Sequence, residues 1–410
     1  MSFDPIRPKW TEVSQNYWFD LFNRFPRDQL AVSLELPAIG TILSDHAAMF
    51  LAFTRALVGV GDVAPNPLVG AVVCDQWGGY LASGGHQRVG GAHAEVNALA
   101  AVTDKNSLDG ARVYVTLEPC AHEGRTPSCA RMLAKTGIAS VTYGVTDPNP
   151  AVNGSGVKIL EAAGKKVRML AGWQTHCEWL ARVFIHNQKT KSVYTAMKVA
   201  SSPSGVIAGD KTSRLWITGE RARQMGHYLR LEYDAICVGA RTVLLDDPTL
   251  DVRHPVLTGR MPIRIIVDGE GILEAQSASF KALSQQPDKT IVFLPINSQD
   301  TLEKRFGVRV VHLPADGRGR FLWSDVKRKL WELGITSLLL EGGAGVYRSA
   351  LEQGAVDALH WFVAPNGPVD GLKWSVNSEV SEIYKSAGGV PLGEDRLIEV
   401  SLSAGGKDFV

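Results

Sequence analysis

Cysteine is scarce in this chain, at five of 410 residues. Two of the five belong to a motif described below, so too few remain for a disulfide framework, and we expect a reducing compartment. An excess of one charge is missing too, because 43 Lys and Arg residues face 42 Asp and Glu residues. Without a net positive charge or a basic run, a nucleic-acid partner is not expected.

Long apolar runs are also absent. No uninterrupted run approaches the length that crosses a bilayer, and the N-terminus lacks the basic-then-apolar pattern of a secretory signal. We therefore expect a cytoplasmic protein with no membrane partner. No glycine-rich dinucleotide-binding fingerprint follows a strand either.

Alternating helical and strand patterns predict an α/β fold, and the length predicts about two to three domains. We divide the chain into an N-terminal extension (1–44), a first α/β domain (45–190) and a second one (191–410). In the first domain we expect helices over 45–57, 93–102, 129–136 and up to 163, a helical bridge over 172–190, and strands over 69–74, 112–117, 139–145 and 166–170. In the second domain we expect strands near 193–200, 234–239, 263–268, 290–294, 308–313, 336–341 and 358–363.

The extension is rich in aromatic residues. Trp18, Leu21, Phe22 and Phe25 recur at helical spacing, and Pro26 ends the pattern. The stripe predicts a helix that packs into the core. Docking onto the next domain or into a dimer interface is the alternative.

The most informative motif is His93-Ala94-Glu95 followed by Cys120 and Cys129. Two thiolates and an imidazole are zinc ligands, and three protein ligands leave the fourth position open to water, as in catalytic zinc sites. Glu95 supplies the carboxylate that moves protons in zinc deaminases. A structural zinc site would need a fourth ligand, such as His86 or His122, and would leave Glu95 without a role.

The expected elements bring these residues together. His93 begins a helix, the strand ending at 117 runs into Cys120, and Cys129 begins the next helix. Helix N-termini favour thiolates. Eight residues separate the two cysteines, where the usual deaminase signature has two.

Two further segments near this motif suit a substrate. In the loop between the cysteines, His122 and Arg125 suit an anionic group such as a phosphate. Asn66 lies between Pro65 and Pro67, and its restricted backbone suits hydrogen bonding to a heterocycle. An ordinary turn is the alternative for Asn66.

The second domain carries weaker motifs. A buried strand over 338–341 ends in Glu341 and a loop of small residues that includes Gly343. Backbone amides there would bind a phosphate at the following helix N-terminus. A plain strand-to-helix turn is the alternative, as it is for Asp246-Asp247-Pro248.

Four stretches of the first domain resemble the deaminase half of bifunctional riboflavin biosynthesis proteins: PNPLVG (65–70), GGHQRVGGAHAEVNAL (84–99), VYVTLEPCAHEGRTPSC (113–129) and DPNPAVNGSG (147–156). The long spacing between the cysteines is characteristic of that family. The resemblance implies a cytidine-deaminase-like domain over 45–190, with zinc on His93, Cys120 and Cys129 and Glu95 as proton shuttle. It also implies substrate contacts from Asn66, His86, His122 and Arg125.

The second domain resembles the reductase half through KVA (198–200), WITG (216–219), DDPTL (246–250) and LEGG (340–343), in that order. The resemblance implies a dihydrofolate-reductase-like fold over 191–410 that uses NADPH, with Lys198 polarising the group that is reduced. The implied NADPH contacts are Ala200, Trp216, Thr242, Asp246 and Gly343. The implied substrate contacts are Arg230, Leu250, Arg253 and Glu341.

Two departures from the family's sequence bear on whether the reductase is active. Where the family continues from Lys198 to an Asp-Gly turn, this chain has Ser204-Gly205, and Arg214 stands where a substrate-binding Ser is expected, although Ser213 is adjacent. A deaminase with an inactive reductase-like domain is therefore one alternative. A paralogue acting on a related pyrimidine and a non-enzymatic zinc-stabilised interaction module are the others.

The resemblance implies a two-step reaction. Water activated by zinc attacks the amino-bearing carbon of the phosphorylated pyrimidinone, and Glu95 protonates the leaving nitrogen. NADPH then delivers hydride to the ribosyl carbon and gives a ribityl chain. We expect the protein to be a homo-oligomer.

Overall fold

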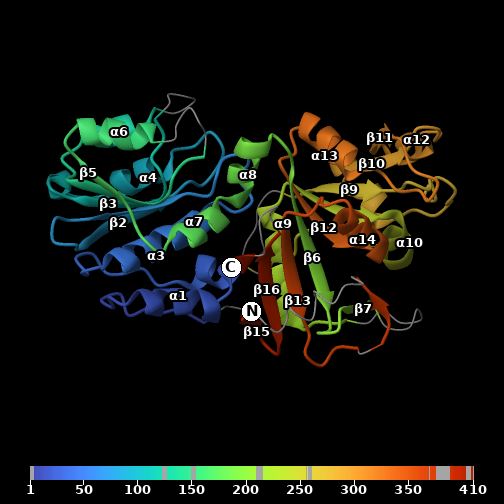
Figure 1. The fold of residues 1–410 in the computed structure, drawn as a ribbon, viewed down its shortest axis with the longest axis horizontal. Coiled ribbons are helices and arrows are strands. Elements are labelled where there is room, and N and C mark those ends of the chain that lie inside the picture. Colours follow the sequence, from blue (N-terminus) through green and yellow to red (C-terminus); the bar gives the residue numbers. More distant parts are fainter. Residues whose placement is uncertain are drawn as a thin grey trace. The chain divides into compact units, whose positions relative to one another are not determined.

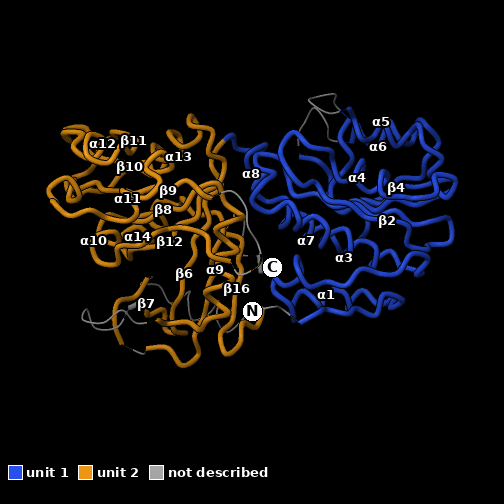
Figure 2. Tube along the Cα trace, turned by 180° about the vertical axis from the view of Figure 1, so that it is seen from behind, with its two compact units in different colours: residues 1–191 blue, residues 192–410 orange. Residues whose placement is uncertain are grey.

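The computed structural model describes residues 4–121, 127–148, 154–208, 216–254, 256, 261–368, 370–374, 388–402 and 408–409. Two compact units divide the chain, residues 1–191 and residues 192–410 (Figure 2). Each unit is built around its own β-sheet. Among the described helices, none has the length and apolar character needed to cross a bilayer.

The first unit contains a five-stranded sheet in the order β2-β1-β3-β4-β5. Its strands are β1 (Gly70–Cys74), β2 (Tyr80–Gly85), β3 (Arg112–Leu117), β4 (Ser140–Val145) and β5 (Lys166–Met169). β1 runs antiparallel to β2 and β3, whereas β3, β4 and β5 are parallel. The four strands predicted for this domain are confirmed.

Strand β2 was not predicted, because its sequence is short of the β-branched residues that mark strands. Close packing of helices against β2 explains why several of its residues are small. A Cβ on Gly84 would lie 2.5 Å from the backbone nitrogen of Ala98, and one on Gly85 would lie 2.1 Å from the carbonyl oxygen of Arg55. Glycine therefore lets two helices approach this edge strand closely.

Helices cover both faces of this sheet (Figure 1). The helices α3 (Asp45–Ala56) and α7 (Gln174–Leu180) lie on one face. On the other lie α4 (Ala94–Ala101), α5 (Cys129–Ala134) and α6 (Ser155–Ala162). Each face has its own apolar core. The bridge predicted over 172–190 is two helices, because the chain leaves helical geometry at Ala181 between α7 and α8 (Arg182–Thr190).

The N-terminal extension packs into the core of the first unit. Its helices are α1 (Gln15–Arg24) and α2 (Arg27–Ser33). Trp18 is fully buried, and its ring lies 5.5 Å from that of Trp10 and 5.2 Å from that of Phe50 on α3. Phe22 packs against Phe50 and Phe53. The aromatic stripe is thus part of the core.

The second unit contains a larger sheet in the order β11-β10-β9-β8-β12-β6-β13-β16-β15, with β17 paired to β16. Its strands are β6 (Tyr194–Ser201), β8 (Ala235–Gly239), β9 (Ile263–Val267), β10 (Thr290–Pro295), β11 (Arg309–Leu313), β12 (Ser337–Gly342), β13 (Ala358–Val363), β15 (Val390–Leu392), β16 (Asp395–Ser401) and β17 (Asp408–Phe409). β11 through β13 are parallel, and β16 is antiparallel to β13. All seven strands predicted here are confirmed, whereas β16 and the short strands β15 and β17 beside it were not predicted.

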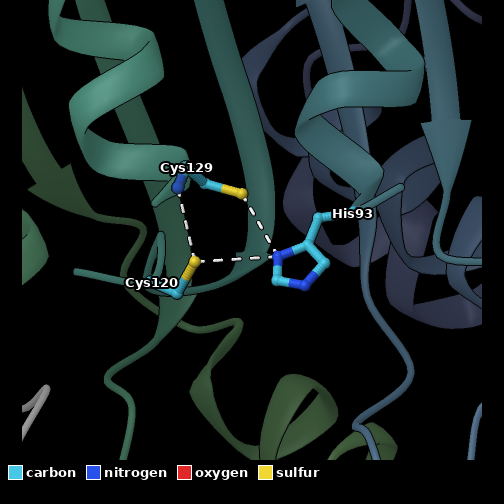
Figure 3. Close-up of side chains that lie close together, drawn as sticks. All are labelled: His93, Cys120 and Cys129. Atoms are coloured by element: carbon cyan, nitrogen blue, oxygen red, sulfur yellow. Dashed lines mark hydrogen bonds between the residues drawn. The ribbon is translucent and has the colours of Figure 1, made fainter. Parts of the chain in front are cut away.

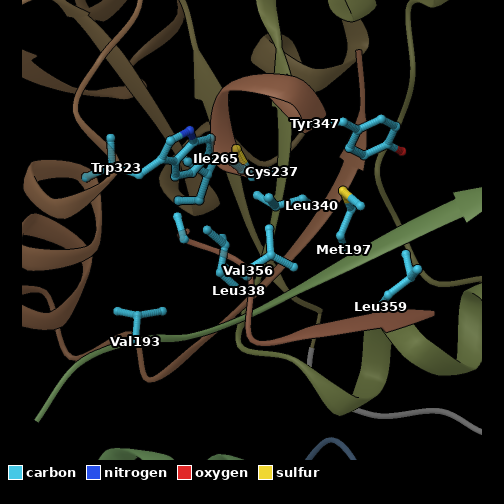
Figure 4. Close-up of a cluster of buried hydrophobic side chains, with 14 of the residues drawn as sticks. Val193, Met197, Cys237, Ile265, Trp323, Leu338, Leu340, Tyr347, Val356 and Leu359 are labelled. Atoms are coloured by element: carbon cyan, nitrogen blue, oxygen red, sulfur yellow. The ribbon is translucent and has the colours of Figure 1, made fainter. Parts of the chain in front are cut away.

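The main helices of this unit are α9 (Glu220–Glu232), α10 (Ala240–Asp246), α13 (Trp323–Glu332) and α14 (Ala344–Glu352). Its shorter elements are α11 (Lys281–Ser284), α12 (Thr301–Phe306) and a ribbon of β7 (Val206–Ala208) with β14 (Leu372–Lys373). Apolar residues of neighbouring strands form two cores, in one of which Met197, Cys237, Leu338 and Leu340 are fully buried (Figure 4). Such continuous apolar strands are typical of parallel sheets covered on both faces.

The buried extension leads to the first prediction. Trp18→Ala should lower the free energy of unfolding of the first unit by about 3–5 kcal/mol, because it removes a fully buried indole and leaves a cavity. Denaturant unfolding followed by circular dichroism measures the change. Val13→Ala is the control, since Val13 is 72% exposed. Equal stability of the two variants would contradict the packing role.

Candidate functional site

The side chains of His93, Cys120 and Cys129 converge in the first unit (Figure 3). Nδ1 of His93 lies 3.6 Å from Sγ of Cys120 and 3.3 Å from Sγ of Cys129. All three possible ligand atoms lie within 4.8 Å of one another. One nitrogen and two sulfurs at this spacing suit a tetrahedral zinc ion.

Three elements hold these side chains. His93 is the N-cap of α4, and Cys129 is the first residue of α5. Cys120 lies beyond the end of β3, where its carbonyl accepts hydrogen bonds from the Ser128 hydroxyl at 2.8 Å and from the Ala130 N–H at 3.1 Å. These two hydrogen bonds hold the start of α5 against Cys120 although eight residues separate the cysteines.

Glu118 is a buried anchor that sequence reasoning did not single out. Its carboxylate accepts hydrogen bonds from backbone N–H groups at the start of α6, among them Gly154 at 3.2 Å and Gly156 at 3.2 Å. A Cβ on Gly156 would lie 2.1 Å from the carbonyl oxygen of Pro119. Gly156 therefore lets α6 pack closely against the segment that carries Cys120.

The two thiols are electrostatically unequal. The hydrogen bond from Cys129 and the nearby His93 lower the pKa of Cys120 to about 4, which favours its thiolate. The same contact with Cys120, together with burial, raises the pKa of Cys129. The pair thus shares one proton, which a divalent cation bound between the sulfurs would displace.

Glu95 lies in the first turn of α4, beside these ligands but outside the group of possible metal ligands. Its side chain is buried, with 4% of the residue exposed. Burial, and next the neighbouring Cys120, raise the pKa of its carboxyl group to about 7. A carboxyl group with such a pKa can both accept and donate a proton near neutral pH.

Asn66 and His86 are hydrogen-bonded to each other, at 3.1 Å between Nδ2 and Nε2. The carbonyl of Ala92, 3.0 Å from Nδ1 of His86, can only accept, so Nδ1 carries the proton. Burial lowers the pKa of His86, so the ring is neutral and Nε2 accepts from the Asn66 amide. This fixes the orientation of the Asn66 amide. The predicted His122 and Arg125 lie outside the described residues.

A cavity of about 870 Å³ in the second unit collects most of the residues predicted there. It lies where β6, β8, β9 and β12 end, which is where parallel α/β sheets bind ligands. Its lining includes all five predicted cofactor contacts and two further predicted residues: Ala200, Trp216, Thr242, Asp246, Gly343, Lys198 and Glu341.

Arg230 is not among the residues that line this cavity, but it forms an ion pair with Glu341, which does line it. Nε and Nη2 of Arg230 donate to the two carboxylate oxygens of Glu341 at 2.7 and 2.9 Å. Burial would raise the pKa of Glu341, but Arg230 and then Lys198 lower it below the usual value. Lys198 is partly buried, and this desolvation lowers the pKa of its amine.

Leu250 and Arg253 also lie outside the cavity lining. Arg253 pairs with Asp251 at 2.8 Å, and the carbonyl of Asp251 accepts from Arg230. Leu250 has a φ of 51°, an uncommon value for a side chain of this size. Arg230 thus links this segment to Glu341 in the cavity lining.

Sequence reasoning missed two residues beside this pair. Nδ1 of His227 accepts from the Arg253 N–H at 3.2 Å, and burial, with Arg230 next, lowers the pKa of His227 to about 4. The Tyr347 hydroxyl donates to the carbonyl of Lys198 at 2.8 Å. The spacing of His227 and Arg230, three residues apart on α9, is the signal that would have found the first.

The turn at Ser204, where this chain differs from the family's Asp-Gly sequence, is well formed. The Gly205 N–H donates to the Ser202 carbonyl at 2.9 Å, and Gly205 has a φ of 81°. The hydroxyls of Ser202 and Ser204 lie 2.9 Å apart. The turn thus closes without the carboxylate that the family has there. Ser213 and Arg214 lie outside the described residues.

Comparison with known proteins agrees with this geometry. Residues 44–145 match the family model of the cytidine and deoxycytidylate deaminase zinc-binding region, and residues 193–366 match that of the RibD C-terminal domain. The riboflavin biosynthesis protein RibD of Actinobacillus pleuropneumoniae is 38% identical over 326 residues, which cover 79% of this chain and 84% of that protein. The chain belongs to the RibD family. RibD of Escherichia coli is 33% identical over 79% of this chain and 88% of its own length.

Solved RibD structures share the fold. RibD of Acinetobacter baumannii (form 1) has a TM-score of 0.69 at 30% identity and covers 87% of this chain and 98% of its own. A protein of Thermotoga maritima has a TM-score of 0.69 at 32% identity and covers 86% of this chain and 97% of its own. It is described as a diaminohydroxyphosphoribosylaminopyrimidine deaminase/5-amino-6-(5-phosphoribosylamino)uracil reductase.

The family match confirms a deaminase domain followed by a reductase domain, and with it an enzyme of riboflavin biosynthesis. A non-enzymatic interaction module is thereby excluded. The two domains of a RibD protein imply a zinc ion and a nicotinamide cofactor.

The metal group leads to the second prediction. Cys129→Ala should reduce the zinc content of the purified protein from about one ion per chain to nearly none, because two ligands do not hold a catalytic zinc ion. Metal analysis by mass spectrometry measures the content. Cys74→Ala is the matched control, since Cys74 is a buried free cysteine outside the group. Full zinc content in Cys129→Ala would refute the ligand set.

Proposed function

We propose that this RibD protein first deaminates 2,5-diamino-6-(5-phosphoribosylamino)pyrimidin-4-one by hydrolysis and then reduces the ribosyl group of the product to ribityl with NADPH. The observation that carries the proposal is the convergence of His93, Cys120 and Cys129 beside the buried Glu95. The two reactions named for the Thermotoga maritima relative support it.

In the proposal, His93, Cys120 and Cys129 hold zinc, and one nitrogen with two sulfurs is a donor set that zinc accepts. When bound in such a site, zinc lowers the pKa of water to about 7 and so supplies a nucleophile at neutral pH. The Cys120 thiolate is already favoured in the metal-free protein, so the ligands are partly prepared for a cation.

Glu95 is the proposed proton shuttle. From the first turn of α4, its carboxylate takes a proton from water and then gives it to the departing amine. The buried position shields this transfer from bulk solvent. Protonation of the leaving nitrogen lets ammonia depart rather than an amide anion.

Asn66 is the proposed contact to the pyrimidine. Its amide nitrogen is engaged by His86, so its oxygen is left to accept from the substrate. His86, 2% exposed and bonded through both ring nitrogens, acts on the substrate through Asn66 in this scheme rather than directly. His122 and Arg125 complete the proposed substrate site by the family resemblance.

In the second unit we propose that the cavity binds NADPH through Ala200, Trp216, Thr242, Asp246 and Gly343. Bound NADPH supplies the hydride. The Lys198 ammonium group lies at the same cavity and would polarise the group that is reduced. The segment with Leu250 and Arg253, together with the Arg230–Glu341 pair, would bind the substrate.

We also propose a cytoplasmic location, which the scarcity of cysteine supports. The homo-oligomeric state stays a prediction, and light scattering on the purified protein tests it.

A third prediction separates the two activities. Glu95→Gln should lower the deamination rate roughly 10²- to 10⁴-fold, because the amide cannot shuttle protons. Zinc content and the reduction of already deaminated substrate should be unchanged. Ammonia release and NADPH oxidation, measured on the same preparation, distinguish these effects. Deamination at the normal rate would remove Glu95 from the mechanism.

A fourth prediction concerns Lys198. Lys198→Met should lower the reductase rate roughly 10²- to 10³-fold, since it removes one charged donor at the reacting end of the cavity. Deamination in the same variant is the control for folding. In the wild type, the reductase rate should fall as pH rises, and at a lower pH than an ordinary lysine would give, because burial lowers the pKa of Lys198. An unchanged rate in Lys198→Met would show that the ammonium has no part in reduction.

A further inference from the structure

A loop over residues 86–92 connects β2 to α4 in the first unit. It begins with His86, which holds the Asn66 amide, and it ends at Ala92, directly before the possible metal ligand His93. Both ends of the loop therefore bear on the site, the first through the proposed substrate contact and the second through the metal group.

Asn97 joins these two ends. Its Nδ2 donates to the carbonyl of Gly85, immediately before the loop, at 2.8 Å, and to the carbonyl of Ala92 at 3.2 Å. Because an amide oxygen cannot donate, two carbonyl acceptors fix which side of the amide faces the loop. The Asn97 backbone N–H, one turn into α4, donates to the His93 carbonyl at 3.0 Å. The same residue thus contacts the strand, the loop and the start of the helix.

The Ala92 carbonyl connects Asn97 to the substrate side of the site. It accepts from Nδ1 of His86 at 3.0 Å as well as from Asn97, and a carbonyl oxygen has two lone pairs for two such donors. This contact keeps the proton of His86 on Nδ1 and leaves Nε2 to accept from Asn66. A chain of three hydrogen bonds therefore leads from Asn97 to the amide that is proposed to face the pyrimidine.

Close packing of α4 on β2 makes this reach possible. A Cβ on Gly84 of β2 would lie 2.8 Å from Cβ of Asn97 and 2.5 Å from the Ala98 nitrogen. A side chain at residue 84 would therefore move α4 away from the strand and lengthen the hydrogen bond from Asn97 to Gly85. The packing fixes the place of the partly buried Asn97 amide, and the two carbonyls fix its direction.

We propose that Asn97 is a positioning residue of the deaminase: it holds the Ala92 carbonyl, and through His86 it sets the orientation of the Asn66 amide toward the pyrimidine. The inference rests on the deaminase function proposed above. In this scheme Asn97 touches neither the substrate nor the metal ion, whose three possible ligands are other residues. Loss of the Asn97 amide should therefore weaken substrate binding without removing zinc.

The first test measures kcat and KM for ammonia release by the full-length, zinc-loaded protein. Asn97→Ala should raise KM for the diaminopyrimidinone ribosyl phosphate on the order of 10-fold and leave kcat within about 3-fold, because hydrogen bonds that orient the substrate contact are lost. Zinc content, measured by mass spectrometry, should be unchanged. A normal KM in Asn97→Ala, or loss of zinc, would overturn the proposal.

Asn97→Asp separates positioning from the filling of space. The aspartate side chain has nearly the same shape, but its ionised carboxylate cannot donate and would face two carbonyl oxygens. Asn97→Asp should therefore raise KM at least as much as Asn97→Ala does. A KM equal to that of the wild type would mean that only the volume of the side chain matters, which would contradict the proposal.

A double-mutant cycle tests the route through Asn66. Asn66→Ala alone should raise KM, because the proposed substrate contact is lost. In that background, Asn97→Ala should raise KM by less than about 2-fold more, since the group that it positions is absent. Effects on KM that multiply would show that Asn97 acts independently of Asn66, and the proposal would be wrong.

Lys105→Met is the matched control. Nζ of Lys105 donates to the carbonyls of Leu99 and Ala100, at 2.7 and 3.3 Å, at the other end of α4. The variant therefore removes two contacts of the same helix with carbonyl groups, but none at the loop. It should leave KM and kcat unchanged. A rise in KM equal to that of Asn97→Ala would show that the effect comes from loosening α4 in general, and would overturn the proposal.

Calorimetric binding of the substrate to Glu95→Gln protein, which should not turn it over, separates this inference from the proposed function. If the substrate binds but the wild type releases no ammonia, the proposed deamination is wrong. Binding that weakens when Asn97→Ala is added then still supports the positioning role, and unchanged binding overturns it. If the substrate does not bind, both are wrong.

Discussion

The deaminase half depends on one constraint, which is that three ligand atoms from three separate backbone elements meet within the reach of a single ion. His93 caps one helix, Cys129 begins another, and Cys120 follows a strand, so a small shift of any of these elements would open the group. The hydrogen bonds that tie Ser128 and Ala130 to the Cys120 carbonyl resist such a shift. The buried Glu118 carboxylate does the same from the side of α6.

In the second unit, a parallel sheet brings residues from separate elements together at one site. Because parallel strands end at one edge, Lys198, Thr242, Glu341 and Gly343 come together although far apart in sequence. The Arg230–Glu341 pair is the most buried ion pair beside the cavity, and it connects the cavity to the segment around Leu250 and Arg253. Breaking it by removing one partner would leave an unpaired buried charge, which is strongly destabilising.

Much of this arrangement could be predicted from the sequence. Long apolar strands and the order of motifs specify local structure, and the metal residues carry a spacing that few other functions share. Interruptions of helices and close packing between helices and strands could not be predicted in the same way. Strand β2 is built from small residues because helices press on it, and the bridge over 172–190 breaks at Ala181, where no proline or glycine marks the break.

Roles that arise only from tertiary contacts were also beyond the sequence. Glu118 belongs to no recognised motif. Its anchoring role comes from hydrogen bonds that it accepts from N–H groups more than thirty residues away in the sequence. His86 was expected to touch the substrate, yet both of its ring nitrogens are engaged within the protein. The sequence identifies each side chain, but the groups that it contacts depend on how the elements pack.

One measurement tests the central claim, that this chain carries out both reactions, most directly. Purified, zinc-loaded protein would be incubated with the diaminopyrimidinone ribosyl phosphate and NADPH, and the products identified by mass spectrometry. The account predicts a deaminated product with a ribityl chain, formed with equal release of ammonia and oxidation of NADPH. Accumulation of the deaminated ribosyl compound with NADPH unspent would contradict it.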